Sequence, residues 1–326
     1  MKKLITLAIT FLLLISCNNE NIKQSGLVFG TSYTIQYNGK TSQSLVANID
    51  SLFYDINKSM STYDASSLIS KINRNEAFEI DVYFATVLDR SKEIYKETEG
   101  AFDPTIGNLV NAWDFGSEGR IVALDSIKID SLMRSVGFNK VSRDGYTIKK
   151  QNPNTYLDFN AIAKGYSVDV VSNFLEGQGI ESYIVEIGGE IRAKGINKEK
   201  DKSWKVGVEM PHFDGTRSII RAISLNNQAM ATSGTYRKYK VDTNGNRYSH
   251  IIDTKTGYPS KTNLLSVSVI ASNCMTADAY ATAFKAMGIE KIKTFLQFHP
   301  ELQVFLIYEN ENQELENLSL NGFPES

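Results

Sequence analysis

Near the middle of the chain, residues 183–194 read Tyr183-Ile184-Val185-Glu186-Ile187-Gly188-Gly189-Glu190-Ile191-Arg192-Ala193-Lys194. Its two short runs on either side of the glycines predict strands, and the glycine pair is typical of a tight hairpin turn. A glycine pair also lets a ligand approach the backbone closely, so a role in binding stays open. An antiparallel pair of strands is therefore expected in the middle of the chain.

Outward from this hairpin, further strands are expected over residues 204–209, 219–225, 265–271 and 302–308, with a hairpin signal at Asn244-Gly245. Alternation also predicts strands from Thr31 to Asn38-Gly39 and over 155–159. Helices are expected near 45–56, 81–100, 161–176 and 275–287, with another amphipathic helix through Phe298. Strands and helices neither alternate strictly nor segregate. This order predicts one α+β domain over residues 27–326, with mixed, largely antiparallel sheets and packed helices.

The first residues resemble the signal of a bacterial lipoprotein. Met1-Lys2-Lys3 is cationic, residues 4–15 are apolar, and Leu14-Ile15-Ser16-Cys17 closes the segment. The apolar run is too short to span a bilayer. We therefore predict a signal peptide over residues 1–16, lipid on Cys17 and a polar tether over 17–26, on a bacterial membrane and facing the periplasm or the cell exterior. An ordinary signal peptide with a chance cysteine is the alternative.

Composition limits the class of partner. The chain has 326 residues, 42% of them hydrophobic and 22% charged, which is ordinary for a globular protein. Its formal net charge of −2 gives no basic surface field, so nucleic acid is not an expected partner. The chain has 2 cysteines, so Cys274 has no partner within the chain if Cys17 carries lipid, and we expect it to be a small buried residue.

Asp278 and Thr282 are the first candidate site residues. They stand four apart in a predicted helix, so a carboxylate and a hydroxyl project from one face. Both are the hard oxygen ligands that Mg²⁺ prefers. Alanines alternate with them and make a thin helix that packs closely, which leaves Asp278 crowded unless it has a cation. The alternative is a solvated aspartate beside a threonine that bonds back to its own helix.

His250 is the second candidate. It follows the hairpin signal at Asn244-Gly245, and Asp253 and the turn Thr256-Gly257-Tyr258-Pro259 come directly after it. One interpretation is a histidine held by backbone geometry near a phosphate. A structural strand histidine is the other, because a lone histidine in a strand is usually structural.

Two further segments have the composition of ligand-binding walls. Gly100-Ala101-Phe102-Asp103-Pro104-Thr105-Ile106-Gly107, with Trp113 after it, joins an aspartate-proline turn to aromatic side chains that suit a planar ligand, or that pack as a loop over the core. Ala231-Thr232-Ser233-Gly234-Thr235 suits hydrogen bonding to a ligand edge, or a turn. Neither a Rossmann glycine motif nor a Walker lysine loop occurs in the sequence.

Taken together, these segments resemble the ApbE family of flavin transferases. The resemblance covers nearly the whole chain after the signal, with the motifs in the family's order. It is carried by Phe29-Gly30-Thr31, Met60-Ser61-Thr62-Tyr63, Gly100-Ala101-Phe102-Asp103-Pro104-Thr105, Asp158-Phe159-Asn160-Ala161-Ile162-Ala163-Lys164-Gly165-Tyr166, Glu186-Ile187-Gly188-Gly189-Glu190, Ala231-Thr232-Ser233-Gly234, His250-Ile251-Ile252-Asp253 and Ala277-Asp278-Ala279.

The resemblance implies a set of site residues. Asp278, Thr282 and the backbone carbonyl of Ala161 would be the Mg²⁺ ligands, and His250 would be the histidine important for catalysis. The positions that would contact FAD are Phe29, Ala101, Phe102, Asp103, Asp158, Lys164 and Ile251. Family members commonly have methionine at the position of Phe29 and proline at that of Thr254, and the position of Lys164 varies between lysine and acid.

The resemblance also implies a reaction, in which Mg²⁺ on the FAD pyrophosphate assists attack by a threonine or serine hydroxyl of an acceptor flavoprotein, AMP leaves and FMN stays attached. Extracytoplasmic subunits of membrane respiratory complexes are the expected acceptors. Two alternatives remain at this point. One is a Mg²⁺-dependent pyrophosphatase that releases FMN and AMP, and the other is a lipid-anchored protein that binds FAD without catalysis.

Overall fold

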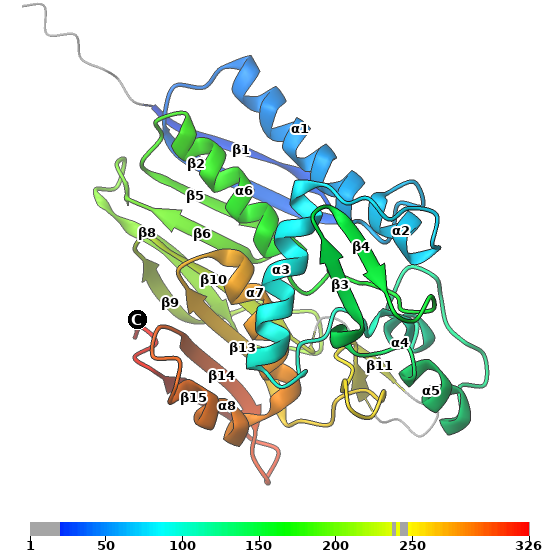
Figure 1. The fold of residues 1–326 in the computed structure, drawn as a ribbon. Helices are drawn as coiled ribbons and strands as arrows, with labels where there is room; N and C mark the ends of the chain where they lie inside the picture. Colours follow the sequence, from blue (N-terminus) through cyan, green and yellow to red (C-terminus); the bar gives the residue numbers. More distant parts are fainter. Residues whose placement is uncertain (1–19, 237–238, 242–246, 326) are drawn as a thin grey trace, which may run out of the picture.

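The centre of the protein is an eight-stranded antiparallel sheet in a computed structural model that describes residues 20–236, 239–241 and 247–325 (Figure 1). The spatial order is β1-β2-β5-β6-β10-β13-β14-β15, and every neighbouring pair runs antiparallel. The strands are β1 (Glu20–Val28), β2 (Thr31–Gly39), β5 (Tyr183–Ile187), β6 (Glu190–Lys194), β10 (Gln228–Gly234), β13 (Leu264–Ala271), β14 (Gln303–Glu309) and β15 (Leu315–Leu320). The predicted antiparallel sheet is confirmed.

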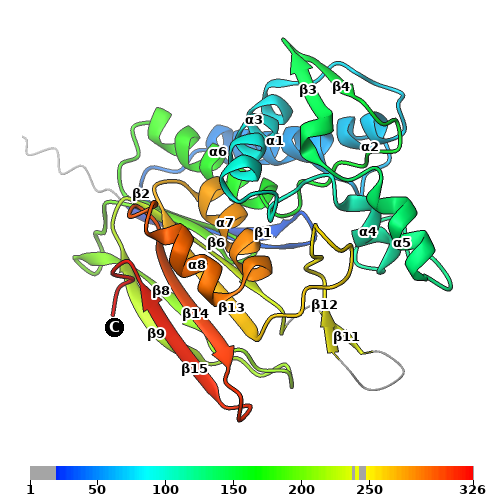
Figure 2. The same ribbon diagram turned by 60° about the horizontal axis from the view of Figure 1, so that its bottom comes forward.

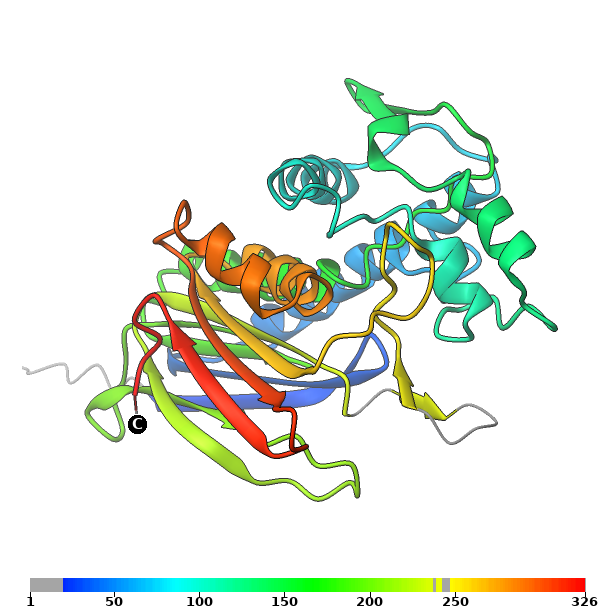
Figure 3. The same ribbon diagram turned by 90° about the horizontal axis from the view of Figure 1, so that it is seen from below.

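Helices cover one face of this sheet, and a small second sheet covers part of the other (Figures 2 and 3). The helices are α1 (Gln43–Met60), α2 (Leu68–Asn73), α3 (Val82–Glu97), α4 (Gly107–Ala112), α5 (Ser126–Met133), α6 (Ala163–Gly177), α7 (Cys274–Met287) and α8 (Ile289–Leu296), with a 3₁₀ turn at Phe138–Lys140. The second sheet consists of β7 (Ile196–Asn197), β8 (Lys202–Glu209) and β9 (Ile219–Leu225). Two hairpins complete the fold, β3 (Val141–Asp144) with β4 (Thr147–Lys150), and β11 (Tyr239–Val241) with β12 (Arg247–Ser249).

The sequence explains where the main helices begin. Ser42, Asp81 and Asn273 each accept a hydrogen bond from the backbone N–H three residues later, at the starts of α1, α3 and α7. Such caps satisfy N–H groups that have no partner within the helix. The apolar stripe expected near 45–56 packs α1 against β2, β5 and α6 in a shared core. The expected helices are therefore confirmed, within a few residues at their ends.

The tether predicted over residues 17–26 is wrong for residues 20–26. These residues belong to β1, which pairs with β2 over its whole length, from Glu20 opposite Gly39 to Val28 opposite Thr31. The polar composition of residues 20–26 does not indicate a strand, but their side chains are largely alternately half-buried and exposed, as in a strand. The ordered fold therefore begins by Glu20 rather than Leu27, while residues 1–16, Cys17 and the rest of the predicted tether lie outside the described residues.

The strand predicted over residues 155–159 is also wrong. Apart from one isolated bridge between Tyr156 and Ile106, this segment is irregular. The side chain of Asn73 takes the place of a neighbouring strand, because it accepts from Leu157 N at 2.8 Å and donates to Leu157 O at 2.9 Å. The amide of Asn73 therefore satisfies the backbone N–H and C=O of Leu157, which a neighbouring strand would have paired in the predicted sheet.

Close packing of α6 on α7 brings together the two helices that matter most for the site. A side chain at Gly165 would place its Cβ 2.4 Å from Cys274 O and 2.7 Å from Asp278 Cβ, so only glycine fits there. Asp169 of α6 accepts from the N–H groups of Cys274 at 3.0 Å and Met275 at 2.8 Å, and so holds the first turn of α7. Cys274 is buried with a free thiol, as expected.

In the part of the chain that the structure describes, no helix has both the length and the apolar character needed to cross a membrane. The hairpin turn expected at Asn244-Gly245 lies outside the described residues, although β11 and β12 on either side of it pair antiparallel.

Candidate active site

A cavity of about 1320 Å³ opens between the β1–β2 turn, the first turn of α6, one face of α7 and the loop that follows β12. Every predicted site residue in the described part of the chain lines it. These residues are Phe29, Ala101, Phe102, Asp103, Asp158, Ala161, Lys164, His250, Ile251, Asp278 and Thr282. The structure thus brings together residues that are far apart in the sequence, from Phe29 to Thr282, in one place.

Asp278 and Thr282 lie on the face of α7 that lines this cavity. Asp278 is only 5% exposed, so the alternative of a solvated aspartate is wrong. Its Oδ2 accepts a hydrogen bond from Gly165 N at 3.0 Å. The helical spacing therefore puts a carboxylate and a hydroxyl one turn apart on the cavity wall, as predicted.

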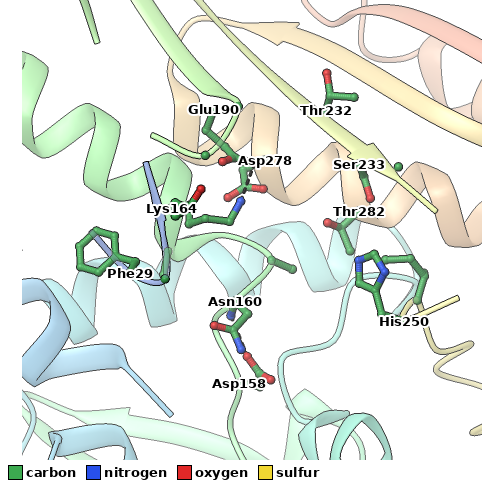
Figure 4. Close-up of a pocket in the computed structure, with 18 of the residues that line it drawn as sticks. Phe29, Asp158, Asn160, Lys164, Glu190, Thr232, Ser233, His250, Asp278 and Thr282 are labelled. Atoms are coloured by element: carbon green, nitrogen blue, oxygen red, sulfur yellow. Dashed lines mark hydrogen bonds and ion pairs between the residues drawn. The ribbon is translucent and has the colours of Figure 1, made fainter. Parts of the chain in front are cut away.

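Lys164, Glu190 and Asp278 form a charge cluster in which the two carboxylates are buried and Lys164 is partly exposed (Figure 4). Lys164 Nζ lies 2.6 Å from Glu190 Oε1, and Glu190 is 3% exposed. Burial raises the pKa of Glu190 to about 7, against the opposing effect of Lys164. Burial also raises the pKa of Asp278, whereas the two carboxylates outweigh burial at Lys164 and raise the pKa of its ammonium. Fully ionised, the cluster carries two negative charges and one positive charge.

The donors at this end of the cavity fit a hard cation. Asp278 and Thr282 offer a carboxylate and a hydroxyl, and Ala161 lines the same cavity. A Mg²⁺ ion would offset the excess negative charge of the cluster, and oxygen donors of this kind are its usual ligands. Among residues 20–325, leaving aside the gaps in the description, no group of three or more His, Cys, Asp or Glu side chains is placed to hold a metal. A cation here would therefore complete its coordination with substrate oxygens and water.

The first turn of α6 gives the cavity a second feature suited to phosphate. Ala161, Ala163 and Lys164 line the cavity at the start of this 15-residue helix. The N-terminal end of a helix carries partial positive charge and favours anions. Asp158 lies just before it, and its Oδ1 accepts from Asn160 N at 2.7 Å, which orders the turn that leads into the helix.

Phe29 reaches the cavity from a strained turn. Phe29 and Gly30 form the two-residue connection between β1 and β2, with φ of 50° and 73°. Positive φ is unusual for a bulky residue, but a two-residue hairpin of this hand requires it at both positions. The ring of Phe29 meets that of Phe53 edge to face at 5.8 Å. Its place at the cavity is therefore imposed by the register of the sheet.

Asp103 uses its carboxylate to shape the loop that carries Ala101 and Phe102. Its Oδ1 accepts from Thr105 N at 2.8 Å and from Thr105 Oγ1 at 2.6 Å, and its Oδ2 accepts from Phe138 N at 3.3 Å. Burial raises the pKa of Asp103, although these hydrogen bonds oppose the shift. We infer that Asp103 acts mainly by holding this loop against the cavity.

His250 directly follows β12, and its ring centroid lies 6.2 Å from that of Phe115. The predicted turn after it is closed by hydrogen bonds, because Gly257 N donates to Asp253 O at 2.8 Å and Asp253 N to Tyr258 O at the same distance. Trp113 Nε1 also donates to Gly257 O at 2.9 Å. The turn thus fixes the backbone that leads away from His250.

Comparison with known proteins agrees with this geometry. The sequence model of the ApbE family matches residues 29–306, which is most of the chain. The chain belongs to the ApbE family. The predicted resemblance is confirmed.

Relatives and solved structures extend the match. The chain is 40% identical over 293 residues to the FAD:protein FMN transferase of Vibrio cholerae serotype O1, with 86% of each chain covered, and 39% identical to that of Haemophilus influenzae, with 96% and 95% covered. The structure of the flavin transferase ApbE from Vibrio cholerae aligns with a TM-score of 0.83 at 36% identity, over 92% of this chain and 97% of that one. The apo flavinyl transferase ApbE of Pseudomonas stutzeri also gives 0.83, at 28% identity, over 92% and 95%. The α+β fold and the prediction of a transferase enzyme are confirmed.

Two charged residues that line this ApbE-family cavity, Glu190 and Arg217, were not among the predicted site residues, whereas other lining segments had been predicted with an alternative. Glu190 is the clearest, although it ends a motif that carried the family resemblance, and its ion pair with Lys164 could not be seen in sequence. Arg217 lines the cavity from the turn between β8 and β9 without a sequence signal. Thr232 and Ser233 line it from β10, so the alternative of a turn at 231–235 is wrong for 231–234. At Gly188 and Gly189 both interpretations hold, because the hairpin turn itself lines the cavity.

Proposed function

We propose that this protein transfers FMN from FAD to a threonine or serine hydroxyl of an acceptor flavoprotein, with the help of Mg²⁺, and releases AMP. The observation that carries the proposal is the single cavity in which Asp278, Thr282, Lys164 and His250 meet. Its volume of about 1320 Å³ exceeds the roughly 300–1,000 Å³ of most small-molecule pockets, which leaves room for a dinucleotide and part of an acceptor. The names of the Vibrio and Haemophilus relatives describe the transfer of FMN from FAD to a protein, which is the coarser part of this proposal.

Asp278, Thr282 and the carbonyl of Ala161 are the proposed holders of Mg²⁺. When bound, the cation would neutralise charge on the pyrophosphate and on the leaving phosphate. Lys164 and the start of α6 add positive potential at the same end of the cavity. Glu190 holds Lys164 by its ion pair, and so keeps the ammonium at the cavity wall.

His250 is the proposed acceptor of the hydroxyl proton. The acceptor oxygen forms a bond to the FMN-side phosphorus, the bond from that phosphorus to the bridging oxygen breaks, and AMP leaves with that oxygen. The proton released from the hydroxyl passes to the imidazole of His250. General-base assistance of this kind typically contributes about a hundredfold or more in rate.

We further propose that the protein works on the outer side of a bacterial membrane, held by lipid on Cys17. The support is the order of cationic, apolar and small residues that ends at Cys17. An anchored enzyme there would reach acceptor hydroxyls in extracytoplasmic parts of membrane-bound respiratory complexes. The proposed acceptors are such flavoprotein subunits.

The test is to incubate the purified protein with FAD, Mg²⁺ and a fragment of a flavoprotein subunit that carries the acceptor hydroxyl, and to weigh the fragment. We expect its mass to rise by one FMN less water, AMP to appear in equal amount, and both changes to require Mg²⁺. Free FMN and AMP with an unmodified fragment would instead show a pyrophosphatase. FAD retained intact for hours would show binding without catalysis, and either result would overturn the proposal.

A further inference from the structure

The hairpin that precedes His250 cannot hold its place by its own hydrogen bonds. β11 and β12 have three residues each, and in the described ranges they pair only with one another. A two-stranded ribbon is marginally stable by itself in water, so side-chain contacts must fix it. The contacts on its two faces, together with the turn that follows His250, therefore set the position of His250.

One face of the hairpin rests on the segment after α4. Lys240 and Tyr248 are opposite each other in the pair, and His250 continues the alternation from Tyr248. The ring of Phe115 lies 5.9 Å from that of Tyr248 and 6.2 Å from that of His250. Lys240 forms an ion pair with Asp114. This face carries the catalytic candidate.

The opposite face is held by Arg247, which packs against two aromatic rings that also contact each other. Its guanidinium carbon is 4.2 Å from the ring centroid of Phe213 and 5.5 Å from that of Tyr239. The two rings meet edge to face at 5.4 Å, and Tyr239 Oη donates to Phe213 O at 3.4 Å. Phe213 belongs to the turn between β8 and β9, so Arg247 joins that turn to the hairpin. Figure 3 shows the two segments at the same edge of the molecule.

The turn between β8 and β9, which Arg247 contacts through Phe213, also lines the cavity. Glu209 and Arg217, on either side of Phe213, line the cavity. Arg217 pairs with Glu209, and Met210 N donates to Ser218 O at 2.9 Å, so the turn is a closed hairpin end rather than a loose loop. Arg247 therefore connects β12 to the turn between β8 and β9, and His250 lies on the opposite face of the hairpin.

We propose that Arg247 is a positioning residue for His250 in the transfer step. The inference rests on the proposed function. Arg247 does not line the cavity in the structure, so it acts through the hairpin and not on the substrate. Its planar guanidinium suits stacking on an aromatic ring such as that of Phe213, the nearer of the two, whereas a lysine ammonium keeps the charge but offers no flat surface to stack. Replacing it by glutamine removes the charge and should let the hairpin shift away from Phe115.

The test compares Arg247→Gln and Arg247→Lys with Arg221→Gln as a matched control. Arg221 makes the same kind of contact, 4.3 Å from the ring centroid of Phe305, but it stands on β9 outside the cavity lining. The readouts are the FAD dissociation constant, kcat for transfer to the acceptor fragment, and hydrogen exchange of peptides that span residues 239–250.

We expect Arg247→Gln to lower kcat about tenfold, within the hundredfold or more that a general base contributes, and to leave the FAD dissociation constant unchanged. Hydrogen exchange of the hairpin should become faster, Arg247→Lys should recover part of the loss, and Arg221→Gln should match the original protein in kcat. The inference is overturned if Arg247→Gln keeps full kcat, if FAD binding falls in step with kcat, or if the lysine variant is no better than the glutamine one. Failure of the unmodified protein to transfer FMN would instead overturn the proposed function.

Discussion

Replacing Asp278 by asparagine should lower the rate of FMN transfer without lowering the stability of the protein. Asparagine has the same shape, and its amide oxygen can still accept from Gly165 N, which lies 3.0 Å from Asp278 Oδ2. That hydrogen bond, worth about 1 kcal/mol, is therefore kept. The change removes one of two negative charges and leaves Lys164 and Glu190 as a matched pair.

The sign of the stability change follows from the pKa of Asp278, which burial raises above its ordinary value. A carboxyl with a raised pKa binds its proton more tightly in the folded state, so its contribution to stability falls as pH rises from the unfolded pKa through the folded one. At pH values above the folded-state pKa, the ionised Asp278 carboxylate lowers the stability of the folded protein by its full amount. In the absence of metal, we expect the Asp278→Asn variant to unfold at the same temperature as the original protein near pH 4, and at an equal or higher temperature at pH 7.

The chemical effect should be large and negative. Metal-assisted stabilisation of charge in a transition state is worth several kcal/mol, and a loss of about 3 kcal/mol lowers the rate roughly a hundredfold. We expect transfer of FMN, measured by the mass of the acceptor fragment, to fall by at least that factor at the Mg²⁺ concentration that saturates the original protein. Added Mg²⁺ should restore only part of the loss, because one ligand is weakened and not the whole site.

The control for this prediction is Asp169→Asn, since Asp169 is also buried and packs at the start of α7, but outside the cavity lining. It accepts two backbone N–H groups and lies 3.0 Å from Arg192 Nη1, so its replacement should lower stability by about 1–3 kcal/mol. The Mg²⁺ concentration that the Asp169→Asn variant requires for transfer should not change. Near-normal transfer by Asp278→Asn, or an equal shift in Mg²⁺ requirement by both variants, would refute the assignment of the metal to Asp278.

Three further changes have expected outcomes. Gly165→Ala should lower the free energy of unfolding by about 1–3 kcal/mol, measured in urea, because the new Cβ would lie 2.4 Å from Cys274 O; an unchanged midpoint would contradict the tight packing of α6 on α7. Thr254→Val should cost about 1 kcal/mol by thermal unfolding, since it removes the hydrogen bond from Thr254 Oγ1 to Gly100 O at 2.6 Å, and no loss would show that this bond does not tie the two loops. Cys17→Ala should move the protein from the detergent phase to the aqueous phase of a phase-separation assay, and continued membrane retention would argue against lipid on Cys17.

Periodicity predicted the helical part of the site because its geometry is local. Asp278 and Thr282 meet on one face through the helical repeat alone, and that spacing is written in the sequence. The same holds for the turn after His250, where Asp253 and Gly257 shape a few consecutive residues. Motifs recognised in the family then placed the distant residues in one site, which local patterns could not do.

The errors arose where distant contacts replaced local ones. The alternation at 155–159 was real, but the amide of Asn73 supplies the backbone partners that a strand would have needed. Glu190 can be buried because Lys164, which comes from another element, forms an ion pair with it. The composition of β1 did not indicate a strand, because none of its side chains is fully buried. The backbone groups of β1 are paired by its neighbour β2, which local patterns do not show.

The early start of β1 limits where an anchored molecule of this kind could work. If Cys17 carries lipid as proposed, two residues separate it from Glu20, where the described part of β1 begins, and three residues of extended chain reach no more than about 11 Å. The far end of the same strand, at Phe29, lies about 30 Å further on at the usual rise per residue. The cavity at that end would therefore lie no more than about 40 Å from the lipidated residue, and an acceptor hydroxyl held farther than that from the membrane surface would be out of reach.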